Sequence, residues 1–278
     1  MARMADEIIS GSGLAVALGA KLIYDVCGPT AKYVGGELAS YTKTGTENLK
    51  RVFENAAKQI EAQNKTQGQV PPRVLKEILS EGYFCEDELQ ALYLGGLLAS
   101  SKGPVPRDDR AVAYCSLVNS LSTYQIRTHG IVYSTILRAT HFHIGEKPFL
   151  IRDLLGTIQK QSLTVAIRET DYRKAMDFSD AENPESIGQH SFVGLEMKGL
   201  SERGTNICYP RDRQGKPKTG EDPFRYFYPT ILGIELFLWG NGFGDCGLDC
   251  YKTDLLQKIK LPFAVEPYVV QPGQVGFA

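Results

Sequence analysis

Several features that mark common protein classes are scarce in this sequence of 278 residues. Its formal net charge is only −1, which excludes binding driven by the charge of the whole protein and leaves room only for local charged patches. Its six cysteines follow no regular spacing, so we expect reduced thiols in a cytosolic protein rather than a disulfide framework. Neither a Walker-type phosphate loop nor a Gly-x-Ser-x-Gly elbow occurs, so the sequence signatures of P-loop nucleotide hydrolases and α/β-hydrolases are missing.

Long hydrophobic runs are also lacking. Residues 8–20 form an uncharged, mostly apolar run before Lys21, but a membrane-spanning helix needs about 20 such residues. Asp6 and Glu7 precede the run, where a secretory signal would carry positive charge. We therefore expect a buried or interfacial helix in a cytoplasmic protein, with contact between residues 8–20 and a membrane surface as the alternative.

The first half of the chain has the apolar spacing of α-helices. The stretch 70–101 predicts two helices joined by a turn, because Pro71 and Pro72 suit a first helical turn and Gly82 interrupts the first apolar stripe. Acidic residues 86–88 then mark the start of the second helix, which is almost wholly apolar toward its end.

Two adjacent glycines, Gly95 and Gly96, lie inside this second helix. Each weakens an exposed helix by about 1 kcal/mol relative to alanine, so we expect them to let another helix approach closely. Helical spacing continues on both sides of the pair of helices, over residues 44–60 and 108–140. The pattern predicts an all-helical domain over residues 1–140.

The second half of the chain mixes short strand and helix patterns. A helix around residues 186–200 precedes two predicted strands that flank a polar loop with glycine and proline, and the apolar run 231–240 predicts a last helix. Helix, strand, loop, strand and helix in this order is typical of a winged-helix module. The predicted fold is therefore mainly α: an N-terminal helical domain, a winged-helix-like α+β domain over residues 141–245, and a short helix with an extended tail over residues 246–278.

Six segments of the chain occur in a recognisable order. From about residue 24 to residue 240 they are YDVCGPTAKYVGGEL, NLKRVFENA, VPPRVLKEIL, EDELQALYLGGLLASS, DDRAVAYCSLVNSLSTYQIRTH and PTILGIELFLWG. In their order and spacing these segments resemble the abortive-infection alpha family of bacterial proteins. The resemblance implies a mostly cytosolic protein associated with phage resistance. Because the family has no agreed reaction and no established catalytic residues, no site residue is carried over.

Basic residues gather in and around the predicted wing. They would suit phosphate contacts with nucleic acid, and the set is Lys198, Arg203, Arg211, Arg213, Lys216, Lys218 and Arg225. Asp212, Glu221 and Asp222 lie among them and dilute the positive field. The alternative is a solvated loop on a module that packs against proteins.

A polar cluster that could support catalysis follows the predicted pair of helices. Asp108, Asp109 and His129 together could hold a metal or act as general acid and base in a hydrolase or nuclease. The alternative gives each a structural role: Asp108 caps a helix, Asp109 and Arg110 form ion pairs, and His129 lies on an apolar helix face.

Two further pairs have the residue types of metal ligands. His141 and His143 would share one face of a strand, and Cys246 and Cys250 could share one face of a helix. A structural zinc site needs four ligands, and the sequence offers neither pair a second pair nearby. We expect neither a metal nor another cofactor.

These patterns favour a non-enzymatic, cytoplasmic protein of antiviral defence that acts in abortive infection by binding nucleic acid or a protein partner. The alternatives are an effector that perturbs membranes through residues 8–20, and a metal-dependent hydrolase or nuclease. The glycine-rich first helix and the extended tail are elements that two chains can exchange, so we also expect a homo-oligomer.

Overall fold

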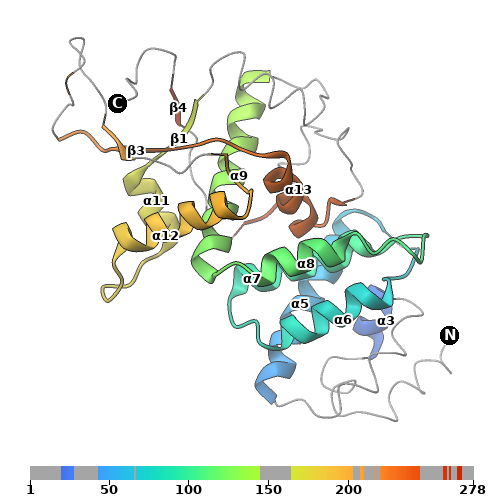
Figure 1. Ribbon diagram of the computed structural model, residues 1–278. Coiled ribbons are helices and arrows are strands. Elements are labelled where there is room, and N and C mark those ends of the chain that lie inside the picture. The colour runs from blue at the N-terminus through green and yellow to red at the C-terminus, as the bar shows by residue number, and fades with distance from the viewer. Residues whose placement is uncertain are drawn as a thin grey trace. The chain divides into compact units, whose positions relative to one another are not determined.

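The computed structural model describes residues 20–27, 43–65, 67–144, 164–202, 207–209, 216, 220–244, 259–261, 263 and 268–270. These residues form helices and one small antiparallel sheet, which confirms the prediction of a mainly helical protein (Figure 1). The chain divides into two compact units, residues 1–120 with 238–245 and residues 121–237 with 246–278. Residues 8–19 of the apolar run, for which a buried or interfacial helix was expected and membrane contact was the alternative, lie outside the described residues. None of the described helices is both long and apolar enough to cross a membrane.

The first unit is helical. Two of its helices, α6 and α7, are those predicted from the stretch 70–101, with Pro72 at the start of α6 and Asp87 capping α7. The Asp87 carboxylate accepts a hydrogen bond of 2.7 Å from the Gln90 amide, which satisfies one of the unpaired N–H groups of the first turn. The described helices of this unit are α3 (Ala20–Cys27), α5 (Lys43–Ala62), α6 (Pro72–Tyr83), α7 (Glu88–Ser101) and α8 (Ala111–Asn119).

Helix α7 is buried on nearly all sides and forms the core of the first unit, with α5, α6 and α8 packed around it (Figure 1). A Cβ atom on Gly95 would lie 2.8 Å from the Val52 carbonyl oxygen in α5. A Cβ atom on Gly96 would lie 1.9 Å from the carbonyl oxygen of Gly240. Both distances are shorter than a carbon–oxygen contact allows, so the prediction that this glycine pair permits close backbone approach is confirmed.

The second unit combines helices with the sheet. The strands are antiparallel in the order β2-β3-β1-β4, with Ala166 of β1 opposite Tyr226 of β3 and Tyr268 of β4. Helix α9 packs against β1, α11 and α12. In chain order the described elements are α9 (Thr123–Ile144), β1 (Thr164–Arg168), α11 (Glu169–Met176), α12 (Pro184–Met197), β2 (Ile207–Cys208), β3 (Phe224–Phe227), α13 (Ile231–Gly240) and β4 (Tyr268–Val270), and the boundary between the units falls inside α13, after Phe237.

Two predictions about the middle of the chain differ from the structure. The N-terminal part of the first unit runs to Ser120, whereas the predicted helical domain runs to residue 140, because α9 packs on elements of the second unit. The strand predicted at His141 and His143 is wrong, because both residues belong to the last turns of α9. A helix, unlike a strand, does not place residues two apart on one face, so the proposed ligand pair loses its basis. The other proposed pair, Cys246 and Cys250, lies outside the described residues.

Candidate functional site

The two aspartates of the predicted catalytic cluster lie in the loop between α7 and α8. Arg110 holds both carboxylate oxygens of Asp108 at 2.7 and 2.6 Å, and this guanidinium group lowers the pKa of the Asp108 carboxyl. Arg73 lies 2.5 Å from the Asp109 carboxylate. The helix cap predicted at Asp108 is wrong, because α8 starts one residue after Arg110. Both carboxylates therefore serve local ion pairs.

His129, the third member of the predicted cluster, is a core residue of the second unit. Its side chain is fully buried, with the ring centroid 4.5 Å from that of Tyr133 and 6.3 Å from that of Phe237. Its Nε2 lies 3.1 Å from the Gly233 carbonyl oxygen, to which it donates a hydrogen bond. Burial lowers the pKa of His129 to about 3. His129 is thus a neutral imidazole packed among aromatic rings, which is a structural role and not a catalytic one. Asp108 and Asp109 belong to the other unit, where they form ion pairs.

The buried imidazole predicts that acid weakens the second unit. The unfolded chain binds a proton at His129 near pH 6.5 and the folded chain only near pH 3, so stability is complete above pH 6.5 and is lost as the pH falls between these values. Lowering the pH from about 7.5 to about 5 should reduce the free energy of unfolding by about 2 kcal/mol. Urea unfolding followed by circular dichroism at both pH values measures this difference in the free energy of unfolding.

Two variants isolate this effect. His129→Gln keeps a hydrogen-bond donor without a titrating ring and should remove most of the pH dependence. His190→Gln changes an exposed imidazole on α12 and should leave the dependence in place. Equal pH dependence in the unaltered chain and in His129→Gln would mean that the His129 ring is not excluded from water.

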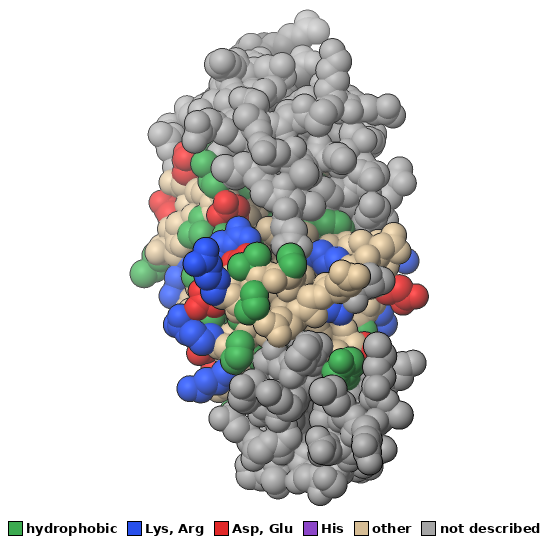
Figure 2. All heavy atoms as spheres, turned by 90° about the vertical axis from the view of Figure 1, so that its right-hand side faces the viewer, with side chains coloured by type: hydrophobic (Ala, Val, Ile, Leu, Met, Phe, Trp, Pro, Cys, Tyr) green, Lys and Arg blue, Asp and Glu red, His purple; other side chains and the backbone are tan. Residues whose placement is uncertain are grey.

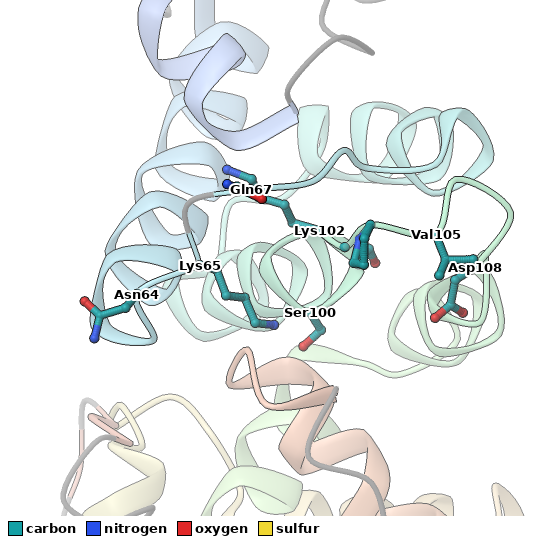
Figure 3. A pocket seen from close by; sticks show the side chains of 10 residues that line it. Asn64, Lys65, Gln67, Ser100, Lys102, Val105 and Asp108 are labelled. Carbon is teal, nitrogen blue, oxygen red and sulfur yellow. The ribbon is translucent and has the colours of Figure 1, made fainter.

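A pocket of about 490 Å³ lies in the first unit and is lined in part by Asp108, one residue of the predicted catalytic cluster (Figure 3). Its two lysines bind backbone carbonyls: Lys65 Nζ lies 3.4 Å from the Ala99 oxygen, and Lys102 Nζ lies 2.6 Å from the Asp25 oxygen. Cations at the ends of α7 and α3 stabilise the negative ends of the helix dipoles. The pocket is lined by Asn64, Lys65, Gln67, Ser100, Ser101, Lys102, Gly103, Pro104, Val105 and Asp108, and its charged groups have structural partners.

Thiol and hydroxyl groups that could act as nucleophiles are also committed to the fold. Burial raises the pKa of Cys85 and of Cys115 to about 12, so both thiols stay protonated at neutral pH. Ser122 Oγ lies 3.3 Å from His190 Nε2, and the same hydroxyl accepts a hydrogen bond from the Gln125 amide as part of a helix cap. The Gln125 side chain in turn accepts from the Ser122 amide at 3.0 Å, and these two reciprocal bonds form a capping box at the start of α9.

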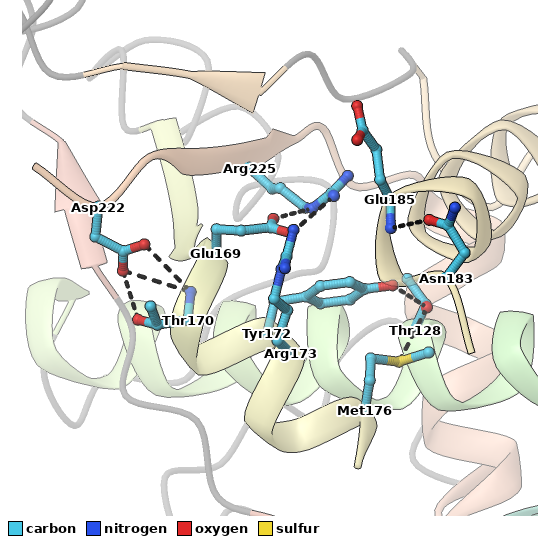
Figure 4. Close-up of polar contacts among 10 residues, drawn as sticks. All are labelled: Thr128, Glu169, Thr170, Tyr172, Arg173, Met176, Asn183, Glu185, Asp222 and Arg225. Atoms are coloured by element: carbon cyan, nitrogen blue, oxygen red, sulfur yellow. Dashed lines mark hydrogen bonds and ion pairs between the residues drawn. The ribbon is translucent and has the colours of Figure 1, made fainter. Parts of the chain in front are cut away.

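Arg225, one of the predicted phosphate ligands, lies in the interior of the second unit and not on its surface. Its side chain is only 3% exposed and forms two hydrogen bonds with the buried carboxylate of Glu169 (Figure 4). Its guanidinium carbon lies 5.1 Å from the ring centroid of Tyr172 and 5.4 Å from that of Phe192. Arg225 therefore links β3 to α11 and α12. Because it is buried, the prediction that Arg225 contacts phosphates of nucleic acid is wrong.

The remaining members of that set are placed only in part. Lys198, directly after α12, and Lys216 are exposed, while Arg203, Arg211, Arg213 and Lys218 lie outside the described residues. Asp222, which was predicted to dilute the positive charge, accepts a hydrogen bond of 2.5 Å from the Thr170 hydroxyl and so fastens the end of this loop to the start of α11. The face of the molecule drawn in Figure 2 carries basic, acidic and hydrophobic side chains interspersed over its described residues.

The exposed face of α12 is a feature that the sequence interpretation missed. Phe192 and Leu195 of this helix are buried, whereas Val193 and Met197 are exposed. The spacing of four residues between Val193 and Met197 was a signal for a second apolar stripe, but spacing alone does not tell which stripe faces the core.

Among the described residues, no group of three or more His, Cys, Asp or Glu side chains is arranged to hold a metal ion. No protein family model matches the chain, and neither a curated protein nor a solved structure is detectably similar to it.

Proposed function

We propose that this chain is a bacterial phage-defence protein of the abortive-infection type that acts by binding a protein partner, and that residues 121–237 form its winged-helix-like binding module. The order α9, β1, α11, α12, β2, β3 supports this assignment, because a winged helix also has helix, strand, two helices and a two-stranded wing. The adjacency of β3 to both β1 and β2 is consistent with it. The defence role rests on the sequence resemblance described above.

The side chains on the exposed face of α12 favour a protein partner over nucleic acid. In helix-turn-helix proteins the corresponding helix enters the major groove and contacts phosphates with basic side chains. Residues 184–197 contain no lysine or arginine, and Glu185 and Glu196 are exposed. Carboxylates at this position repel the DNA backbone, while exposed Val193 and Met197 offer apolar surface to a protein.

Nucleic-acid binding remains the second candidate because Lys198 and Lys216 are exposed. A gel-shift assay of the full chain with duplex DNA and with RNA at rising salt separates the two candidates. We expect no shift at about 150 mM salt, where the screening length is about 8 Å. A complex that forms at this salt, weakens steeply as salt rises and is lost in Lys216→Glu would contradict the choice of a protein partner.

Phage plating tests the defence role and the absence of catalysis together. Expression of the chain in a bacterial host should lower the plating efficiency of at least one phage in a panel, and Asp109→Asn should protect equally well, because Asp109 only pairs with Arg73. Full susceptibility to every phage tested would contradict the defence role. Loss of protection in Asp109→Asn, with unchanged urea unfolding, would favour the hydrolase or nuclease hypothesis instead.

A further inference from the structure

Exposed apolar side chains lie at the end of α12 and at the start of α13 in the second unit. Met197 is 81% exposed and Val193, one turn earlier on the same side of α12, is 42% exposed. Leu232 of α13 lies beside the end of α12, because a Cβ atom on Gly199 would come within 3.9 Å of its Cδ2. We name Val193, Met197, Ile231 and Leu232, which are all exposed, the α12–α13 surface.

Acidic side chains flank this surface. At about 100° per residue, Glu185 and Glu196 lie within about 80° of Val193 around the axis of α12, on the side opposite to Met197. Both glutamates are exposed. The exposed side of α12 thus has an apolar centre and an acidic edge, and Lys198 just beyond its end is the nearest cation in sequence.

The opposite side of α12 is fixed to the core. A Cβ atom on Gly188 would lie 2.9 Å from the Arg225 guanidinium group, and one on Gly194 would lie 1.9 Å from the Gln125 amide nitrogen. The Phe192 ring packs 5.3 Å from that of Tyr172. Since both glycines permit close contact and the helix is anchored along its length, the exposed side chains are presented on a rigid support, which reduces the entropy cost of binding.

We infer that the α12–α13 surface docks a basic amphipathic segment of a partner protein. Apolar side chains of that segment cover Val193, Met197 and Leu232, and its lysines or arginines lie against Glu185 and Glu196. The charge complementarity selects a basic partner over an acidic one, and an amphipathic segment laid on an apolar helix face is a recurring mode of peptide recognition. This inference rests on the proposed function, because it identifies the surface and the partner chemistry of the same module.

A synthetic peptide of about 18 residues, or five helical turns, tests the chemistry. One peptide has leucine on one side of the helix and lysine on the other, a second has glutamate in place of lysine, and a third has the first composition in scrambled order. Fluorescence anisotropy with the full chain should show binding of the first peptide at least about tenfold tighter than of either control, a difference of about 1.4 kcal/mol.

Variants locate the binding. Val193→Glu with Met197→Glu should weaken binding of the leucine-lysine peptide by about tenfold or more. Glu185→Lys with Glu196→Lys should weaken it and reduce its dependence on salt. The matched control is Phe84→Glu with Glu61→Lys, which makes the same kinds of change at an exposed apolar and an exposed acidic residue of the first unit, and it should bind as the unaltered chain does.

Methionine methyl resonances give a second readout. The sequence has four methionines, and Met197 is exposed whereas Met176 is buried in the same unit. With methyl-labelled methionine, addition of the leucine-lysine peptide should shift the Met197 signal and leave that of Met176 in place. A peptide that shifts neither signal, or that binds the Phe84→Glu/Glu61→Lys control as weakly as it binds the α12 variants, would overturn the inference.

The outcomes separate this inference from the proposed function. If the peptide binds through Val193 and Met197 but the chain gives no phage protection, the docking surface is supported and the defence role is contradicted. If Val193→Glu/Met197→Glu loses phage protection but the chain does not prefer the lysine peptide, the proposed function is supported and the inferred basic partner is contradicted. A dimer in sedimentation that the same double variant dissociates identifies a second copy of the chain as the occupant and also overturns the inference.

Discussion

Replacing Gly96 with valine should destabilise the first unit by about 3 kcal/mol, the upper end of the usual cost of overpacking a core. The added Cβ atom would lie 1.9 Å from the Gly240 carbonyl oxygen and 2.8 Å from the Asn241 amide nitrogen. Both are backbone atoms, so no change of rotamer makes room and the helix itself has to move. Urea unfolding followed by the fluorescence of Trp239 measures the loss, because this is the sole tryptophan of the sequence and it is buried in the first unit.

Gly103→Ala is the matched control for this experiment. It adds a methyl group to a glycine just beyond the end of α7, where nothing lies within 4 Å of the new atom. Its free energy of unfolding should stay within about 0.5 kcal/mol of that of the unaltered chain. If Gly96→Val unfolds at the same urea concentration as Gly103→Ala, then α7 does not approach Gly240 in the folded chain.

The helices of the first unit could be predicted because their signals are local. Pro72, Gly82 and Asp87 act within one or two turns of where they stand, and α6 and α7 begin and end around them. The glycine pair in α7 also predicted a close contact, because glycine lowers helix stability and its presence in an apolar helix therefore needs another reason. Its partner Gly240 could not be predicted, because that contact joins segments far apart in the sequence.

The predicted site residues failed where burial decides their role. Arg225 lies beside a basic loop in the sequence, but its environment is set by Glu169. That residue precedes it by 56 positions and is brought close by the pairing of β1 with β3. The environment of His129 is also set by residues distant in the sequence. The sequence showed only that His129 lies on an apolar helix face, whereas Gly233 and Phe237, which contact its ring, come from α13. For the two aspartates, ion pairing was foreseen for Asp109 and Arg110, but their partners differ: Arg110 binds Asp108, and Asp109 binds Arg73 from the start of α6.

Replacing Arg225 with methionine should destabilise the second unit by about 3–5 kcal/mol, because it leaves the buried carboxylate of Glu169 without its main counter-charge. Methionine keeps an apolar chain between Tyr172 and Phe192, so most of the effect comes from the lost charge and not from an empty space. Hydrogen exchange of the amides of β1 and β3 measures the loss in this unit. Exchange that is unchanged in Arg225→Met contradicts the buried pair.

Arg173→Met is the matched control, because Arg173 binds the same carboxylate at 2.8 Å but from the surface, with its side chain about half exposed (Figure 4). An exposed ion pair contributes at most about 1 kcal/mol, so we expect amide exchange in Arg173→Met to stay close to that of the unaltered chain. Equal effects of the two arginine substitutions would mean that Arg225 is solvated like Arg173.

A double substitution separates the pairing from the burial of each charge. Glu169→Gln alone leaves the Arg225 guanidinium group buried without its carboxylate, and we expect a loss similar to that of Arg225→Met. When Glu169→Gln is combined with Arg225→Met, neither buried charge of the pair remains, so the double variant should be more stable than the sum of the two losses predicts. Strict additivity would show that the two side chains do not interact in the folded chain, and α11 and β3 would then have to be held together by the apolar contacts of Tyr172 and the strand pairing alone.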